Sequence, residues 1–182
     1  VAPPALSINI SYPGASAKVV EDMKQMLRIA PSNQKMRENI FKYLLQTGKP
    51  DVAVQVADEG LKLDPYNWDL YDLKSNACLF QSNFPCAIDA LEAAYQVDST
   101  RADSLFYRKI SVAAAQQPDN LRLAKWAGRG VARYPDNAEL LSYANQGYVL
   151  SGKLDSGVTV TRKRLKIDPT QTVKTLLVKG TG

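Results

Sequence analysis

The chain has 182 residues, of which 45% are hydrophobic, and a formal net charge of +5. This length and composition suffice for one continuous hydrophobic core, so we expect a single domain or a single repeat array. No run approaches the roughly 18 apolar residues of a membrane-spanning helix, which excludes a transmembrane segment, and there is no histidine, the most frequent acid or base near neutral pH.

The N-terminal part of the chain contains one predicted helix. Residues 1–15 are predicted to be extended, because proline and glycine recur in them and disfavour a helix. In residues 16–33, the apolar side chains Val19, Met23 and Met26 follow helical spacing. We therefore predict a half-repeat helix in residues 16–33.

Asp-Pro or Pro-Asp pairs, with Asp98-Ser99 in the place of one of them, recur at a regular distance in residues 34–171. The distance along the chain from Asp64 to Asp98 equals that from Pro135 to Pro169. The distance from Ser99 to Pro135, between these two intervals, is two residues longer. The recurring step is about 34 residues, a period typical of helix-hairpin repeats. The sequence therefore predicts four hairpins in residues 34–171.

The first three hairpins each place a turn between two helical patterns. Apolar residues recur every four positions from Met36 to Leu44, ahead of the first turn at residues 48–50. The second turn falls at residues 82–85 and the third at residues 117–120. We place the two additional residues of the longer step in this third turn.

The fourth hairpin and the C-terminal end depart from this pattern. Thr161 and Arg164 stand where the other hairpins have small apolar side chains, so we expect this helix to be rotated or loosely packed. Residues 172–178 are either a short capping helix or the start of a truncated repeat, and residues 172–182 are assigned to that element.

The pattern of small residues and turns resembles the tetratricopeptide repeat (TPR) family. That family pairs two antiparallel helices per repeat, with small side chains where they touch and a proline-bearing turn at the end. The resemblance implies an all-α fold, a right-handed superhelical array of antiparallel helix hairpins. The matching small positions are Ala53, Ala57, Gly60, Ala87, Ala94, Ala127 and Gly130.

The resemblance also implies that the first helix of each hairpin lines a concave groove for a peptide or partner protein. The groove positions are Lys42, Leu45, Asn76, Leu79, Phe80, Arg108, Val112, Tyr143 and Gln146. Apolar side chains there would hold side chains of the partner, and amides would bond its backbone. For Leu79 and Phe80 a second interpretation stays open, in which they form core between repeats. The carboxylate clamp of some family members is only partly matched, because Glu38 and Asp72 would repel a terminal carboxylate.

Charge is distributed unevenly along the chain. Residues 34–101 have a balance of −3, whereas residues 102–182 have a balance of +7. Two predicted second helices contribute a basic patch to the convex side: Arg122, Lys125, Arg129, Arg133, Arg162 and Lys163. Two interpretations remain, a solvated helix face or a contact with an anionic partner such as an acidic protein, a phospholipid surface or a glycan.

Motifs of catalysis and cofactor binding are missing from the sequence. It contains no glycine-rich nucleotide loop and no nucleophile elbow, and adjacent carboxylates on a helix point about 100° apart and do not converge. We therefore predict a non-catalytic scaffold that binds a protein or peptide, with no cofactor, no metal and no small-molecule substrate. Nucleic acid is disfavoured, because the basic stripe lacks interleaved exposed aromatic residues. The alternative function is an adaptor that binds an anionic surface or polyanion through the basic patch.

The two cysteines are predicted to lie on either side of one hairpin turn. Cys78 is predicted near the end of the first helix of the second hairpin and Cys86 in the first turn of the next helix, so a disulfide is geometrically possible. The other interpretation is a pair of reduced thiols that fill space between close helices in a cytosolic protein. A disulfide would indicate a periplasmic or extracytoplasmic location, with which the start of the sequence at Val1 is compatible.

Overall fold

The computed structural model describes residues 16–167, which contain helices and no strand. After α1 (Ser16–Ile29), the helices form four hairpins: α2 (Gln34–Gln46) with α3 (Pro50–Leu63), α4 (Trp68–Phe80) with α5 (Phe84–Val97), α6 (Ser104–Ala115) with α7 (Asn120–Arg133), and α8 (Ala138–Leu150) with α9 (Leu154–Ile167). Residues 1–15 and 172–182, with their predicted segments, lie outside this range. Within it, no helix has the length and apolar character that crossing a membrane requires.

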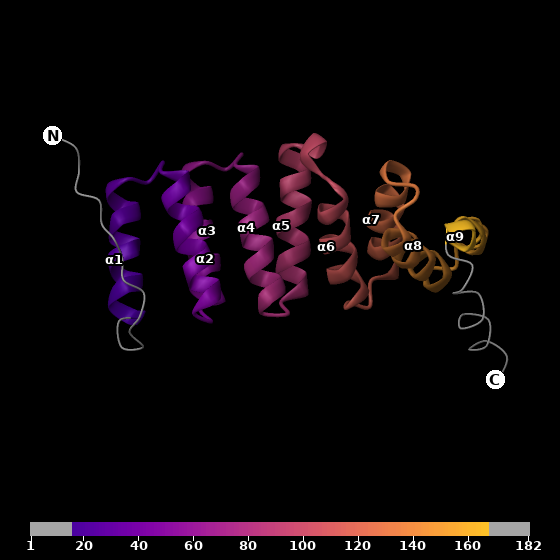
Figure 1. The fold of residues 1–182 in the computed structure, drawn as a ribbon, viewed down its shortest axis with the longest axis horizontal. Helices are drawn as coiled ribbons and strands as arrows, with labels where there is room; N and C mark the ends of the chain where they lie inside the picture. Colours follow the sequence, from indigo (N-terminus) through magenta and orange to yellow (C-terminus); the bar gives the residue numbers. More distant parts are fainter. Residues whose placement is uncertain (1–15, 168–182) are drawn as a thin grey trace.

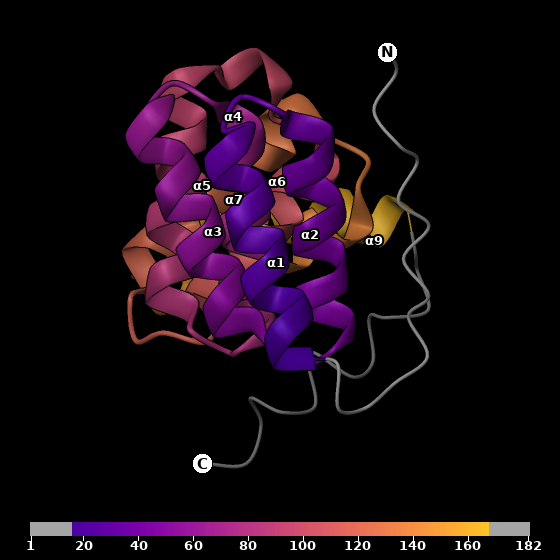
Figure 2. The same cartoon turned by 90° about the vertical axis from the view of Figure 1, so that its left-hand side faces the viewer.

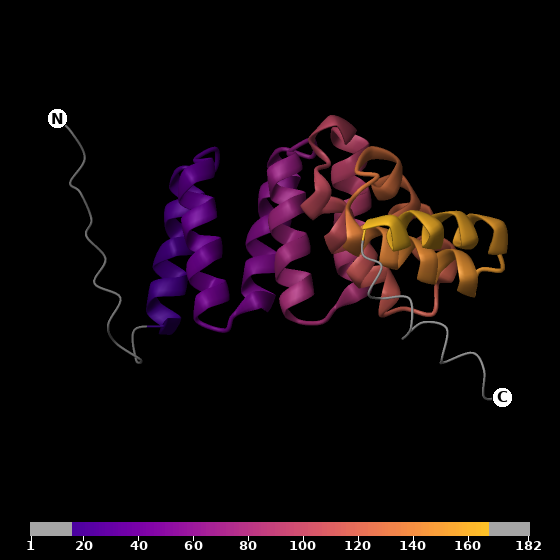
Figure 3. The ribbon, with the colours of Figure 1, turned by 45° about the vertical axis from the view of Figure 1, so that its right-hand side comes forward.

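The hairpins stack side by side in chain order (Figure 1). Seen along the stack, α3 and α5 lie on one side of the array and α2 and α6 on the other (Figure 2). The axes of α8 and α9 are turned away from those of the N-terminal helices (Figure 3). The array is therefore an all-helical superhelix in which the first helices α2 and α6 and the second helices α3 and α5 lie on opposite sides.

Asparagine and aspartate side chains begin most of these helices. Asn33, Asn67, Asp103 and Asn137 each cap a first helix by accepting a hydrogen bond from the backbone N–H three residues later. Such a bond satisfies one of the free N–H groups of the first turn. The step from Asn67 to Asp103 is two residues longer than the steps before and after it, which are equal. The caps therefore mark the repeat period directly.

The two additional residues lie between hairpins, so their predicted position in the third turn is wrong. The caps of α6 and α7, Asp103 and Asp119, are separated by the same number of residues as the caps of α4 and α5, Asn67 and Asn83. The extra length instead forms the short 3-10 helix η2 (Ser99–Arg101) between α5 and α6. Helix packing fixes the turn within a hairpin, whereas the connection between hairpins has room for one more turn.

Small side chains bring the helices close together. All five predicted alanines of the small-residue face are fully buried, and Gly60 and Gly130 are buried as well. The buried apolar residues form two clusters, one spanning α1 to α4 and a larger one spanning α4 to α9. Both clusters include residues of α4, which therefore joins the N-terminal and C-terminal parts of the core.

The helix α9 packs through a different set of side chains from the other second helices. Gly157 and Val160 are buried, whereas Thr161 is half-buried and its Oγ1 lies 2.9 Å from Asn145 Oδ1 on α8. Arg164 is half-buried as well. A polar contact thus stands where the other hairpins bury an apolar side chain.

Candidate protein-binding surface

The groove positions predicted from the sequence all lie on the first helices. They are distributed over α2 (Lys42, Leu45), α4 (Asn76, Leu79, Phe80), α6 (Arg108, Val112) and α8 (Tyr143, Gln146). We call the outward side chains of these four helices the first-helix surface. Its chemistry depends on which of its side chains bond to one another and which stay exposed.

A polar network joins α4 to α6 on this surface. Lys109 Nζ pairs with the Asp72 carboxylate and also donates to Asn76 Oδ1 at 3.2 Å. Asn76 Nδ2 in turn donates to Asp72 Oδ2 at 3.2 Å. The side-chain amide of Asn76 is therefore engaged on both sides, and Lys109 offsets the charge of Asp72 that would repel an anionic ligand.

Further polar contacts link the remaining first helices. Arg108 Nη1 on α6 lies 3.6 Å from Glu139 Oε1 on α8, and both side chains are about half exposed. At the other end, Asp69 on α4 accepts hydrogen bonds from Gln34 on α2 and from Arg101. Burial alone would raise the pKa of the Asp69 carboxyl, but these hydrogen bonds and the Arg101 charge hold it below its usual value. The polar side chains thus follow the array from α2 to α8.

Exposed apolar side chains stand beside these polar contacts. Phe80 is 61% exposed, whereas Leu79 is half-buried against the large core cluster. Of the two interpretations of these residues, core between repeats therefore holds for Leu79, whereas Phe80 lies on the surface. Leu105 and Leu150 are exposed on α6 and α8, which the sequence reasoning missed. Leu150 occupies the same place in its repeat as Phe80, so alignment of the repeats would have found it.

The basic stripe of α7 contacts α5 and the segment that follows it. Arg122 Nη2 lies 3.4 Å and Lys125 Nζ lies 3.8 Å from the Glu92 carboxylate, which also accepts a 2.7 Å hydrogen bond from Trp126 Nε1. Glu92 thus accepts hydrogen bonds from Arg122 and Trp126 and forms an ion pair with Lys125, all on the next second helix. The sequence reasoning missed Glu92, because this residue lies a whole repeat before its partners in the chain.

The rest of the stripe is also in contact with neighbouring groups. Arg129 lies over the rings of Tyr95 and Trp126, at 5.3 and 4.9 Å from their centroids. Arg133 donates to the backbone oxygens of Ser99 and Thr100. On α9, Arg162 and Lys163 are exposed. The α7 stripe has a structural role between second helices, and its binding of an anionic partner stays a prediction.

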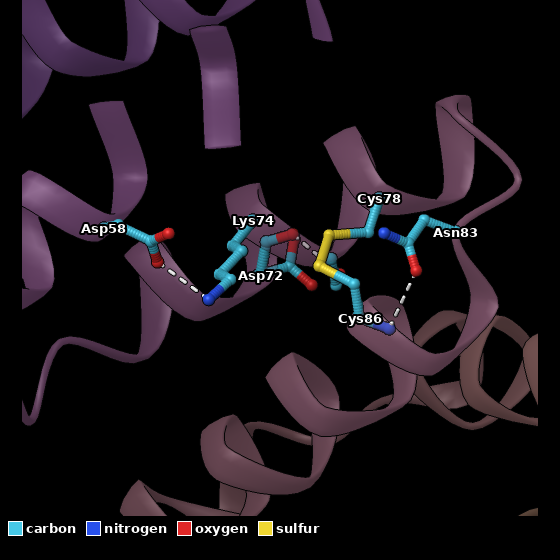
Figure 4. Close-up of a disulfide and its surroundings, with 7 residues drawn as sticks. Asp58, Asp72, Lys74, Cys78, Asn83 and Cys86 are labelled. Atoms are coloured by element: carbon cyan, nitrogen blue, oxygen red, sulfur yellow. Dashed lines mark hydrogen bonds and ion pairs between the residues drawn. A yellow bond between two sulfur atoms is a disulfide. The ribbon is translucent and has the colours of Figure 1, made fainter. Parts of the chain in front are cut away.

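Cys78 and Cys86 are joined by a disulfide in the structure, with their Cα atoms 5.7 Å apart (Figure 4). The bond closes the turn between α4 and α5, and Asn83 in that turn accepts a hydrogen bond from Cys86 N. Nearby, Lys74 on α4 pairs with Asp58 on α3 at 2.7 Å (Figure 4). The second hairpin is therefore tied both internally and to the first hairpin.

We expect protein matured under oxidising conditions to contain no free thiol. Alkylation of the unfolded, unreduced chain should leave its intact mass unchanged, and a sample reduced beforehand should gain two alkyl groups. Because the closed loop is short, reduction should cost only about 2.5 kcal/mol of stability. Two free thiols in the unreduced sample would contradict the bond.

Comparison with known proteins relates the chain to solved structures only. No family model matches the sequence, and no curated protein matches it. The crystal structure of MamA superposes with a TM-score of 0.66 at 17% identity, covering 92% of this chain and 99% of MamA. YrrB, described as a TPR protein with an unusual peptide-binding site, has a TM-score of 0.66 at 15% identity, covering 82% of this chain and 76% of YrrB.

The same likeness extends to a thermophilic protein. TTC0263, a TPR protein of Thermus thermophilus, has a TM-score of 0.51 at 16% identity, covering 86% of this chain and 84% of TTC0263. The chain has the TPR fold. This confirms the predicted fold class and the resemblance on which it was based.

Proposed function

We propose that the chain is a non-catalytic scaffold that binds a segment of another protein along the first-helix surface. The observation that carries the proposal is the combination of exposed apolar side chains with polar contacts on one layer of helices. Phe80, Leu105 and Leu150 are 61%, 49% and 55% exposed on three successive first helices. Such side chains offer apolar contacts to a peptide, and the adjacent Asn76 network and Gln146 offer hydrogen bonds.

The TPR fold supports this proposal. YrrB, which has the same fold, is described as having a peptide-binding site. The proposed contacts with a bound peptide are exposed side chains of this chain itself. Phe80 is the central contact in this proposal, because its exposed fraction exceeds those of Leu105 and Leu150.

A charge change at Phe80 should abolish partner capture. We expect Phe80→Asp to lose proteins retained by the parent chain on an affinity support, because the carboxylate would oppose burial of apolar surface. Leu121→Asp is the matched control, since Leu121 is 63% exposed but lies on the second helix α7. Quantitative mass spectrometry of the captured proteins measures the difference.

The two variants together test whether the captured proteins bind the first-helix surface. Loss with Phe80→Asp and retention with Leu121→Asp supports binding on the first-helix surface. Equal capture by the parent and Phe80→Asp contradicts it. Capture on an apolar surface should also persist at about 1 M salt, where electrostatic screening shortens to about 3 Å.

An alternative function is binding of an anionic partner through the basic patch. It is supported by α9, on which Arg162 and Lys163 are exposed. This contact would be electrostatic, so the same capture experiment at high salt would remove the partner. Salt-sensitive capture that is indifferent to Phe80→Asp would favour the alternative over the groove.

A further inference from the structure

A pocket of about 280 Å³ lies between the first two hairpins, away from the predicted groove. Its walls come from the connection before α2, the start of α2, the end of α3 and the start of α4. None of the nine predicted groove positions contributes to it. The pocket is therefore distinct from the nine predicted groove positions, although Gln34, which bonds Asp69 on the first-helix surface, also lines it.

The buried side chain of Arg37 forms part of the pocket wall. Arg37 is only 4% exposed. Its guanidinium lies over the backbone of Gly60, because a Cβ atom built on Gly60 would stand 3.0 Å from Arg37 Cζ and Nε. Gly60 itself lines the pocket. The missing side chain at position 60 therefore makes room for the guanidinium at the pocket.

The charge of Arg37 has neutral hydrogen-bond acceptors but no close anion. Nη1 donates to Val56 O at 3.0 Å and Nη2 donates to Pro31 O at 2.7 Å. In residues 16–167, no carboxylate lies within ion-pair distance of this guanidinium. Burial lowers the pKa of Arg37, and the more distant Glu59 raises it in part. A buried cation without an anion is costly, so an anion in the pocket would be stabilising.

The other walls limit what kind of anion fits. Leu63 and Leu70 supply apolar surface, and Leu63 is 64% exposed at the rim. Asp64 also lines the pocket, with its Oδ2 accepting from Asn67 Nδ2 at 2.9 Å. This carboxylate disfavours a doubly charged ligand such as phosphate, whereas a single carboxylate needs only one cation.

We propose that this pocket binds a carboxylate carried next to an apolar group, with the carboxylate against Arg37 and the apolar group against Leu63 and Leu70. In a partner protein, this chemistry is supplied either by an acidic side chain beside a leucine or by a C-terminal leucine. Binding here would give the N-terminal hairpins a contact of their own.

The first test uses 4-methylpentanoate as the probe, with its neutral analogue 4-methylpentanamide as the control. In backbone amide NMR spectra, the carboxylate should shift the signals of Gly60 and Leu70, and the amide should bind at least about tenfold more weakly. Sodium chloride at the same ionic strength should leave these signals in place. Equal binding of the two probes, or no shift of these signals with a carboxylate at about 10 mM, would overturn the proposal.

A second test blocks the pocket without altering the core. Ser32 lines the pocket and is exposed, so Ser32→Glu should fold and place a tethered carboxylate beside Arg37. We expect Ser32→Glu to lose the response to 4-methylpentanoate and Ser32→Gln to keep it. An unchanged response in Ser32→Glu would also overturn the proposal, and helical circular dichroism checks the fold of both variants.

Short peptides then distinguish the two sources of the carboxylate. Acetyl-Glu-Leu-amide carries it on a side chain, acetyl-Gly-Leu carries it at the C-terminus, and acetyl-Gln-Leu-amide carries none. Tighter binding of either acidic peptide than of the neutral peptide supports the proposal and shows which carboxylate, side-chain or C-terminal, the pocket binds. Equal binding of all three peptides contradicts the proposal. Because Ser32 lies off the first-helix surface, Ser32→Glu should not change the Phe80-dependent capture, so the two proposals can fail separately.

Discussion

Replacing Ala94 by arginine is expected to unfold the second hairpin or destabilise the array by about 3–5 kcal/mol. Ala94 on α5 is fully buried in the larger core cluster, where small side chains bring adjacent helices together. An arginine there would force the helices apart or bury an unpaired charge. Ala87→Arg should behave in the same way, because Ala87 is equally buried.

The matched control for this prediction is Ala132→Arg on α7. Ala132 is exposed, and arginine is a good helix former, so this variant should melt close to the parent. Thermal unfolding followed by far-ultraviolet circular dichroism measures all three variants. If Ala94→Arg melts within a degree or two of the parent, the buried register of α5 is wrong.

Replacing Gly147 by alanine is expected to cost about 2 kcal/mol or more, even though alanine is the better helix former. Gly147 lies on α8 where it meets α7, and an added Cβ would stand 2.5 Å from Ala124 N and 2.7 Å from Ala124 Cα. These are backbone atoms of a packed helix, which cannot move aside without shifting the whole helix. The clash should therefore outweigh the gain of about 1 kcal/mol in helix propensity.

Gly157→Ala provides the control, because the added methyl group would meet a side chain that can move and not the backbone of a helix. Gly157 is also buried in a helix, but its added Cβ would approach Val149 Cγ2 at 3.1 Å, a methyl group that can rotate away. The free energy of unfolding of this variant should stay within about 1 kcal/mol of that of the parent. Denaturant titration of both variants separates the two cases, and a Gly147→Ala variant as stable as Gly157→Ala would contradict the close approach of α7 and α8.

The packing of each repeat against its neighbours explains why substitutions at Ala94 and Gly147 should strongly reduce stability. Each hairpin buries its apolar faces mainly against its neighbours, so a clash between α7 and α8 disturbs the contact between two repeats. Phe80, by contrast, is exposed at the end of α4, and Phe80→Asp should alter binding with little change in stability. Substitutions at the buried positions therefore test stability, and the substitution at Phe80 tests partner capture.

The sequence by itself determined the helical class, the period and the small-residue faces. These features are local, because a helix hairpin repeats the same spacing of apolar residues and the same turn within one period. The asparagine and aspartate caps carry the same information, and their spacing would have located the two additional residues before Asp103. The place of Phe80 at the end of a first helix also follows from the repeat alone.

Only the tertiary structure decided which side chains meet across repeats. The pairing of Lys109 with Asp72, the shared carboxylate of Glu92 and the pocket at Arg37 each join residues from helices far apart in sequence. Such contacts depend on the rotation of each helix about its axis and on the distance between neighbours. Residue spacing within one helix fixes neither quantity, since both result from the packing of the whole array.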